Sequence, residues 1–292
     1  MKLIVNAAAK INLSLDITGV LENGYHSLIM VMQSVNLCDT VILEKTDSGT
    51  VELTCSEPVL PCDKRNIAYK AALMFFGGTG IENPGLRIHI TKRIPFAAGL
   101  AGGSADAAAV ICGLNVLFEA GLSETALCAI GIKVGSDVPF CIAGGTRLVE
   151  NTGDKMTLLP PVPHFYAVLA KPAQGVSTAE AYGAFDRAQN IRHPDNEGIL
   201  AAVKDGNLAA IAAKADNVFE QVISLPELDT LRRVLEDAGA LTVRMSGSGP
   251  TLFGIFDSAP MAQLALEQVR ACGKAENAAL CEPVAWGVQI EP

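Results

Sequence analysis

Apolar and polar residues alternate with a period of two along much of the first hundred residues. Ile11, Leu13, Leu15 and Ile17 are separated by single polar residues, which is the spacing of a strand with one buried face. Similar patterns predict further strands over 3–9, 28–37, 40–44, 51–55 and 86–90. A helix is expected over 66–76, ending at the pair Gly77–Gly78. The first third should therefore be mostly sheet.

A second helix is predicted directly after the glycine-rich segment 95–105. Ala107, Ile111 and Leu114 fall on one helical face, and the opposite side is rich in alanine. This helix is therefore expected to be buried on all sides. A short helix over 124–130 and a strand that opens at Gly144–Gly145 should follow it.

Three prolines, at 160, 161 and 163, separate two strand-like segments and mark a domain boundary. Helices and strands alternate beyond them. Strands are expected over 166–170, 241–245, 251–256 and 284–290, and helices over 196–219, 226–238 and 260–272. The chain is thus predicted to be an α+β protein with mixed sheets and packed helices, divided into domains 1–160 and 161–292.

Composition narrows the classes of partner. The 292 residues carry a formal charge of −9, so the chain has no general attraction to nucleic acid or to anionic membranes. No stretch approaches the roughly 18 apolar residues of a membrane-spanning helix, and the start of the chain reads as a strand rather than a signal peptide. A cytoplasmic protein with a small-molecule substrate is expected. The composition does not determine its oligomeric state.

Cysteine spacing gives no sign of a metal site. The eight cysteines include no C-x-x-C pair, and their spacing fits neither a zinc site nor a disulfide framework. We expect reduced thiols and no metal held by the protein alone.

The strongest local signal for chemistry is the segment from Gly99 to Ser104. A glycine-rich loop that opens a buried helix can bring backbone N–H groups and the positive end of the helix close to an anion. The alternative is a tight strand-to-helix turn with Ser104 as a helix cap. Three closely spaced glycines before a helix of small residues favour a phosphate site. The segment matches neither G-x-x-x-x-G-K-[ST] nor G-x-G-x-x-G.

Several other residues each have a structural and a functional interpretation. Asp137, before Val-Pro, is either a helix cap or a carboxylate base. Lys10 is either an edge residue or a buried cation that needs a partner such as Asp137. Tyr25, in Gly24-Tyr25-His26, either packs at a hairpin tip or stacks on a base. The turn at 247–249 is, taken alone, only a turn.

Taken in order, these segments resemble the GHMP kinase superfamily. The matching motifs are Ala9 to Leu13, Pro95 to Ala105 and Met245 to Pro250, and the likeness extends over nearly the whole chain. The resemblance implies a two-domain fold with the active site in the cleft between the domains. It also implies a transferase that uses ATP, with Mg²⁺ entering with the nucleotide near Ser104.

The resemblance also implies residue roles. Lys10 and Asp137 would be the catalytic pair, with Asp137 as the base for the substrate hydroxyl and Lys10 stabilising its carboxylate. The residues implied in ATP binding are Asn66, Pro95, Phe96, Ala97, Ala98, Gly99, Leu100, Ala101, Gly102, Gly103, Ser104 and Ala105. Those implied in substrate binding are Asn12, Tyr25, His26, Thr178 and Tyr182, and the C-terminal glycine-rich loop is Gly247, Ser248 and Gly249.

Within the family, Gly24-Tyr25-His26 together with Gly135 to Pro139 is similar to members that phosphorylate a cytidine diphosphate alcohol of the non-mevalonate route to isoprenoids. Met32 stands where some relatives carry an aromatic residue, and Ala97, Ala98 and Ala105 replace Gly or Ser.

Two alternatives remain open. One is a family member that acts on mevalonate, homoserine or a sugar, against which Tyr25 and His26 argue, because those substrates have no base to stack on. The other is a nucleotide-binding regulator without catalysis, against which the presence of both Lys10 and Asp137 argues.

Overall fold

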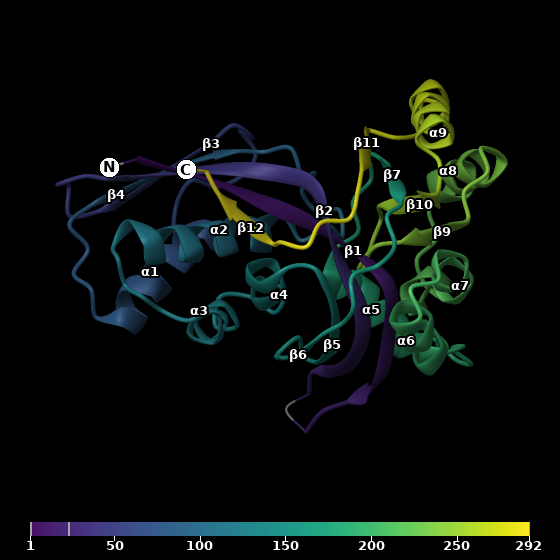
Figure 1. The fold of residues 1–292 in the computed structure, drawn as a ribbon, viewed down its shortest axis with the longest axis horizontal. Coiled ribbons are helices and arrows are strands. Elements are labelled where there is room, and N and C mark those ends of the chain that lie inside the picture. The colour runs from purple at the N-terminus through teal and green to yellow at the C-terminus, as the bar shows by residue number, and fades with distance from the viewer. Residues whose placement is uncertain (1, 23, 292) are drawn as a thin grey trace.

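Two β-sheets, each packed against helices, make up the computed structural model, which describes residues 2–22 and 24–291 (Figure 1). The first sheet has the strand order β12-β1-β2-β4-β3, with β5 and β6 continuing from β2 and β8 pairing with β1. Its strands are β1 (Lys2–Val20), β2 (His26–Lys45), β3 (Val51–Cys55), β4 (Leu86–Thr91), β5 (Thr146–Asn151), β6 (Lys155–Leu158), β8 (Asp216–Asn217) and β12 (Val288–Ile290).

The two longest strands, β1 and β2, form an antiparallel hairpin that extends along both halves of the molecule (Figure 1). Each replaces two shorter strands predicted from the sequence, because local register shifts bend the pair without breaking it. The alternation in β1 predicted one buried face, and the structure buries the polar positions as well. Asn12, Ser14 and Asp16 are at most 2 % exposed, because the C-terminal elements cover this face.

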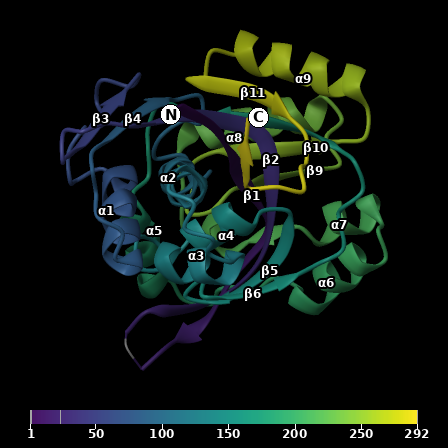
Figure 2. The same cartoon turned by 60° about the vertical axis from the view of Figure 1, so that its left-hand side comes forward.

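Helices α1 (Ile67–Thr79), α2 (Gly102–Leu117), α3 (Glu124–Gly131) and α4 (Val138–Ala143) lie together beside the first sheet (Figure 2). The predicted end of α1 at Gly77–Gly78 is wrong. The helix continues to Thr79 and stops at Gly80, whose φ of 70° is the left-handed conformation that favours glycine at a helix end. As predicted, α2 is buried nearly all round. At Gly113 a Cβ would lie 2.4 Å from a methyl carbon of Leu43, so glycine lets α2 pack directly on the sheet.

The second sheet has the order β11-β7-β10-β9 and is antiparallel throughout. Its strands are β7 (Tyr166–Lys171), β9 (Thr242–Met245), β10 (Leu252–Phe256) and β11 (Asn277–Cys281). Helices α8 (Pro226–Asp237) and α9 (Ala259–Ala271) pack on it. Between β7 and β9 in sequence lie α5 (Thr178–Arg187), α6 (Asn196–Lys204), α7 (Leu208–Lys214) and the 3₁₀ turn η1 (Val218–Gln221).

Three elements, β6, α5 and β11, were not anticipated, and the single helical region expected over 196–219 divides into α6, α7, β8 and η1. The expected last strand over 284–290 begins only at Val288.

The proline-rich segment at 160–163 lies between β6 of the first sheet and β7 of the second. However, β8 and β12 return to the first sheet from beyond this point, and Val5 pairs with Ile290 beside both termini. The domain boundary at residue 160 therefore stays a prediction, because the first sheet also contains β8 and β12 from the segment 161–292. Among residues 2–22 and 24–291, no helix is long and apolar enough to span a membrane.

Candidate active site

A cavity of about 510 Å³ is lined by elements of both halves of the molecule. Its walls come from β1, the segment before α2, the starts of α2, α4 and α5, and the turn at 247–249. The predicted site residues that line it are Lys10, Asn66, Pro95, Phe96, Ala97, Ala98, Gly99, Ala101, Gly102, Gly103, Ser104, Asp137, Thr178, Tyr182, Gly247, Ser248 and Gly249. The motifs found separately in the sequence thus meet around one space.

Five predicted site residues do not line this cavity. Leu100 and Ala105 are buried behind it, while Asn12 lies in the layer directly beneath Lys10. His26 packs on Tyr182, which does line the cavity. Tyr25 is 67 % exposed near the tip of the β1–β2 hairpin.

The glycine-rich segment ends where α2 begins, and the beginning of α2 differs from the expected one. The helix starts at Gly102, and its N-cap is Ala101, with a φ of 58° and no side chain able to cap. Ser104 is therefore inside the first turn, which rules out its alternative role as N-cap. The first-turn amides of Gly102, Gly103 and Ser104 are among those that a helix leaves without an intrahelical partner. At the cavity wall they form a place for an anion.

The segment before α2 contacts Ser246, which directly precedes the turn at 247–249. Ser246 donates a hydrogen bond from Oγ to the carbonyl oxygen of Gly99, at 2.9 Å. A Cβ on Gly99 would lie 2.0 Å from the carbonyl oxygen of Ser246, and Gly99 has a φ of 72°. Only glycine fits here. The turn at 247–249 is thus part of the cavity wall and not a remote connection.

Lys10 is a buried cation held on the floor of the cavity. Its Nζ donates to Oδ1 of Asn12 at 2.6 Å, and the same oxygen accepts from the amide N–H of Gly247 at 2.9 Å. Burial lowers the pKa of Lys10, while the negative charge of Asp137 acts in the opposite direction. Asn12 therefore fixes Lys10 relative to the C-terminal glycine-rich loop.

Asp137 occupies the N-cap position of α4, but its side chain makes no capping hydrogen bond. The interpretation of Asp137 as an ordinary cap is therefore unsupported. Its carboxyl group is half-buried, lines the cavity and acts on Lys10 through charge. Burial, with Asp137 adding to it, also raises the pKa of Tyr182 to about 12. The Asp137 carboxyl group therefore lines the cavity without serving as a helix cap.

Aromatic residues gather beside this end of the cavity. The His26 ring lies 4.7 Å from that of Tyr182 and 6.2 Å from that of Phe185, measured between centroids. Nε2 of His26 is 2.7 Å from Oδ1 of Asp186. Phe185 and Asp186 were missed from the sequence, although Tyr182 and Phe185 stand three residues apart on α5, the spacing of one helical face. Met32 is 1 % exposed and packs in the core.

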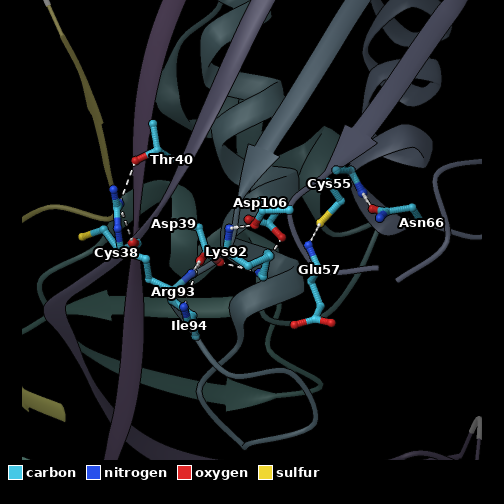
Figure 3. A network of polar contacts seen from close by, with 12 residues as sticks. Cys38, Asp39, Thr40, Cys55, Glu57, Asn66, Lys92, Arg93, Ile94 and Asp106 are labelled. Atoms are coloured by element: carbon cyan, nitrogen blue, oxygen red, sulfur yellow. Dashed lines mark hydrogen bonds and ion pairs between the residues drawn. The ribbon is translucent and has the colours of Figure 1, made fainter. Parts of the chain in front are cut away.

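A second polar group at the cavity was also missed. Figure 3 shows Lys92, directly after β4, between the carboxylates of Asp39 and Asp106. Lys92 and Asp106 line the cavity, and Lys92 Nζ is 2.7 Å from Asp106 Oδ2. Burial raises the pKa of Asp106 to about 8, with Lys92 opposing and Asp39 adding to the shift. The three residues lie far apart in sequence, so no local pattern connects them.

Two family profiles match separate parts of the chain. The profile of the GHMP kinases N terminal domain matches residues 66–145, and that of the GHMP kinases C terminal domain matches residues 199–275. The 4-diphosphocytidyl-2-C-methyl-D-erythritol kinase of Clostridium botulinum (strain Eklund 17B / Type B) is 43 % identical over 268 residues, which cover 91 % of this chain and 95 % of the relative.

Two solved structures are similar over nearly their full length. A crystal structure of 4-(cytidine 5'-diphospho)-2C-methyl-D-erythritol kinase superposes with a TM-score of 0.79 at 30 % identity, covering 97 % of this chain and 99 % of its own. The homoserine kinase of Cytophaga hutchinsonii reaches the same TM-score, 0.79, at 23 % identity, covering 99 % of this chain and 97 % of its own. The second match supports the fold alone, and together they confirm the predicted two-domain α+β fold.

Proposed function

This chain belongs to the GHMP kinases and, among them, to the 4-diphosphocytidyl-2-C-methyl-D-erythritol kinases, and from that premise we propose that it transfers the γ-phosphate of ATP to the 2-hydroxyl group of 4-diphosphocytidyl-2-C-methyl-D-erythritol. The reaction belongs to the non-mevalonate route to isoprenoid precursors. The observation that supports this most directly is the single cavity that brings Asp137 and Lys10 together with the first turn of α2.

Phosphoryl transfer needs an aligned hydroxyl, a proton acceptor and stabilised phosphate charge, but little covalent chemistry from the protein. We assign Asp137 as the acceptor of the hydroxyl proton, because its carboxylate faces the cavity without serving as a helix cap. Lys10 stabilises that carboxylate and the negative charge that develops on the transferred group. The amides of Gly102, Gly103 and Ser104 hold phosphate oxygens at the helix start.

The hydroxyl oxygen of Ser104 in the first turn of α2 also suits Mg²⁺. Ser104 lines the cavity there, while the described residues contain no group of three or more metal-binding side chains. This fits an ion that binds mainly through nucleotide phosphates, as Mg²⁺ commonly does. When bound, Mg²⁺ would neutralise charge on the phosphate groups, with Ser104 as its protein ligand.

The aromatic end of the site suits the cytosine of the substrate. The rings of His26 and Tyr182, each of which carries a polar group, lie side by side, and the ring of Phe185 meets that of His26 edge-on. A planar base can stack on such rings. Tyr25 and Thr178 complete the proposed substrate contacts, and Asn12, buried beneath Lys10, would act through that lysine. Thr178 and Ser248 are within hydrogen-bond distance of each other, at 3.3 Å between hydroxyl oxygens.

A coupled ADP-release assay tests the proposal directly. The enzyme should release ADP with 4-diphosphocytidyl-2-C-methyl-D-erythritol and much more slowly with mevalonate or homoserine, because neither of these carries a base. The phosphorylated product should be identified by mass spectrometry. Comparable turnover of mevalonate or homoserine, with none of the cytidylated substrate, would refute the assignment while leaving the kinase family intact.

A further inference from the structure

Asn217 is a fully buried polar residue directly behind the wall of the cavity. It lies in β8, which pairs with β1 so that Asn217 is opposite Leu15. Asn217 does not itself line the cavity, and it belongs to none of the motifs found in the sequence. A buried carboxamide is stable only where hydrogen bonds replace its hydration. Its partners therefore indicate what it does.

The side chain of Asn217 connects two parts of the site. Its Nδ2 donates to the carbonyl oxygen of Met245 at 2.7 Å and to that of Gly247 at 2.9 Å. Its Oδ1 accepts from the amide N–H of Phe219 at 3.0 Å. Both donor hydrogens of the carboxamide are thus used on the backbone at 245–247, and its oxygen is used at the start of η1. Aspartate has the same shape but lacks these donors, and serine is too short to reach the turn.

Gly247 is held from both sides. Its amide N–H donates to Oδ1 of Asn12 at 2.9 Å, and its carbonyl oxygen accepts from Nδ2 of Asn217. Because a peptide group is planar, the two bonds fix the orientation of both peptide groups that flank the Cα of this glycine. A Cβ on Gly247 would lie 3.0 Å from Nζ of Lys10, so the glycine packs directly on the catalytic lysine.

We propose that Asn217 is a positioning residue for phosphoryl transfer, which acts by holding Gly247 against Lys10. Without the bond to its carbonyl oxygen, one of the two peptide groups of Gly247 is free to rotate, and Lys10 loses a fixed neighbour. A misplacement of about 1 Å at a reacting group can lower a rate a hundredfold. The inference rests on the proposed kinase function and deepens it, because it assigns a residue outside the cavity to the placement of Lys10.

A second role of Asn217 has to be separated from this one. Its bond to Phe219 caps η1, and the ring of Phe219 lies 5.1 Å from that of Tyr182 in the cavity wall. Asn217→Ser separates the two roles, because serine is a good helix cap but cannot reach the carbonyl oxygens of the turn. We expect kcat to fall about tenfold, while KM for ATP and KM for the acceptor stay within about threefold of wild type.

Asn207→Ser is the matched control. Asn207 is exposed and caps α7, where its Oδ1 accepts from the amide of Ala210 at 3.0 Å. This variant makes the same chemical change at a helix start away from the cavity and should leave kcat unchanged. Thermal denaturation of each variant sets an assay temperature well below every unfolding midpoint, so that a lower kcat does not reflect unfolded protein.

A double variant provides a readout that general destabilisation would not change. If Asn217 acts through Lys10, Asn217→Ser should slow the Lys10→Met enzyme by less than about twofold, since the placement of Lys10 no longer matters there. If Asn217→Ser does not fold, Asn217→Asp keeps the size of the side chain and the acceptor for the Phe219 amide but removes both donors to the turn. It allows the same comparison.

Four outcomes overturn the proposal. An unchanged kcat in the folded variant makes Asn217 structural only, and an equal loss in Asn207→Ser assigns the effect to stability. A full loss that persists in Lys10→Met shows that Asn217 does not act through this lysine. A higher KM with an unchanged kcat assigns Asn217 to the phosphate segment or to the aromatic wall. Each variant is compared with wild type on the alcohol that the wild type phosphorylates, so these results are independent of the proposed acceptor.

Discussion

Lys10 donates a hydrogen bond from Nζ to Oδ1 of Asn12, 2.6 Å away and two residues along the same strand. Residues two apart on a strand face the same side, so the pair acts as one unit on the floor of the cavity. Because that oxygen also accepts from the amide of Gly247, Asn12 ties the N-terminal motif to the C-terminal one.

Asn12→Ala should therefore impair both catalysis and stability. It removes the acceptor for a buried ammonium and for a buried amide, which costs about 1–3 kcal/mol of unfolding free energy for each group left unpaired. We expect kcat to fall about tenfold or more, measured alongside chemical denaturation. Asn6→Ala, on the same strand but outside the site, is the control and should leave kcat unchanged. Equal kcat values for the two variants would show that Lys10 needs no support from Asn12.

The approach of Gly99 to Ser246 can be tested with a matched pair of glycines. Gly99 and Gly206 have similar positive φ values, 72° and 62°, but a Cβ on Gly206 meets nothing within 4 Å. Alanine at either position costs about 1–2 kcal/mol in the left-handed conformation. Only Gly99→Ala should also displace the phosphate segment and raise KM for ATP, by about tenfold. A KM for ATP that is the same in both variants would mean that the contact with Ser246 does not shape the site.

Strand and helix positions were largely predictable, because periodic apolar residues report which face is buried. The errors in β1 and α1 have identifiable physical causes. Asn12, Ser14 and Asp16 keep the period of an exposed face, yet elements from the other half of the chain cover them. Gly77–Gly78 signals a helix end, but Gly80 is the residue that adopts the left-handed conformation.

The site was predictable where its residues form contiguous motifs and not where tertiary contacts build it. Lys10, Asp137 and the segment at 99–104 came from local patterns and a family resemblance, and they line one cavity. Lys92, Asp39 and Asp106 come from three elements brought together only by folding. The roles assigned to Lys10, Asp137 and the segment at 99–104 are predictions to be tested.

Thiol reactivity should reflect burial rather than a functional cysteine. Cys62 is the one exposed cysteine among the eight, all of which lie in the described part of the chain. Burial raises the pKa of Cys38 to about 11 and of Cys112 to about 12, so both stay protonated and unreactive near neutral pH. A disulfide reagent should modify about one thiol rapidly, and Cys62→Ser should abolish that phase without loss of activity.

Zinc chelators and dithiothreitol should leave activity unchanged, since the residues described contain no metal-binding cluster and the cysteines are free. Activity lost with dithiothreitol alone would contradict this expectation. Several fast-reacting thiols in the folded protein would contradict the burial of the others.

The catalytic pair gives the most direct test of mechanism. Asp137→Asn keeps the size of the side chain and removes the proton acceptor, and because Asp137 does not cap α4 through its side chain, the fold should be unaffected. The rate should fall by about two to four orders of magnitude, the usual scale for loss of a general base. Binding of both substrates should change little, since the interaction matters mainly in the transition state. Asp154→Asn, in an exposed turn, is the control and should be neutral.

Lys10→Met should slow the reaction as well, because it removes the charge that acts on Asp137 and on the transferred phosphate. It also removes a buried cation whose burial lowers its pKa, so the protein should not lose much stability. The double variant should be little slower than the slower single variant, because residues that act as a unit are not additive. If the two losses multiplied, the residues would be acting independently, with Lys10 serving the phosphate alone. A folded Asp137→Asn enzyme with a near-normal rate would instead remove Asp137 as base and leave positioning and charge stabilisation by Lys10 and the first turn of α2 as the source of catalysis.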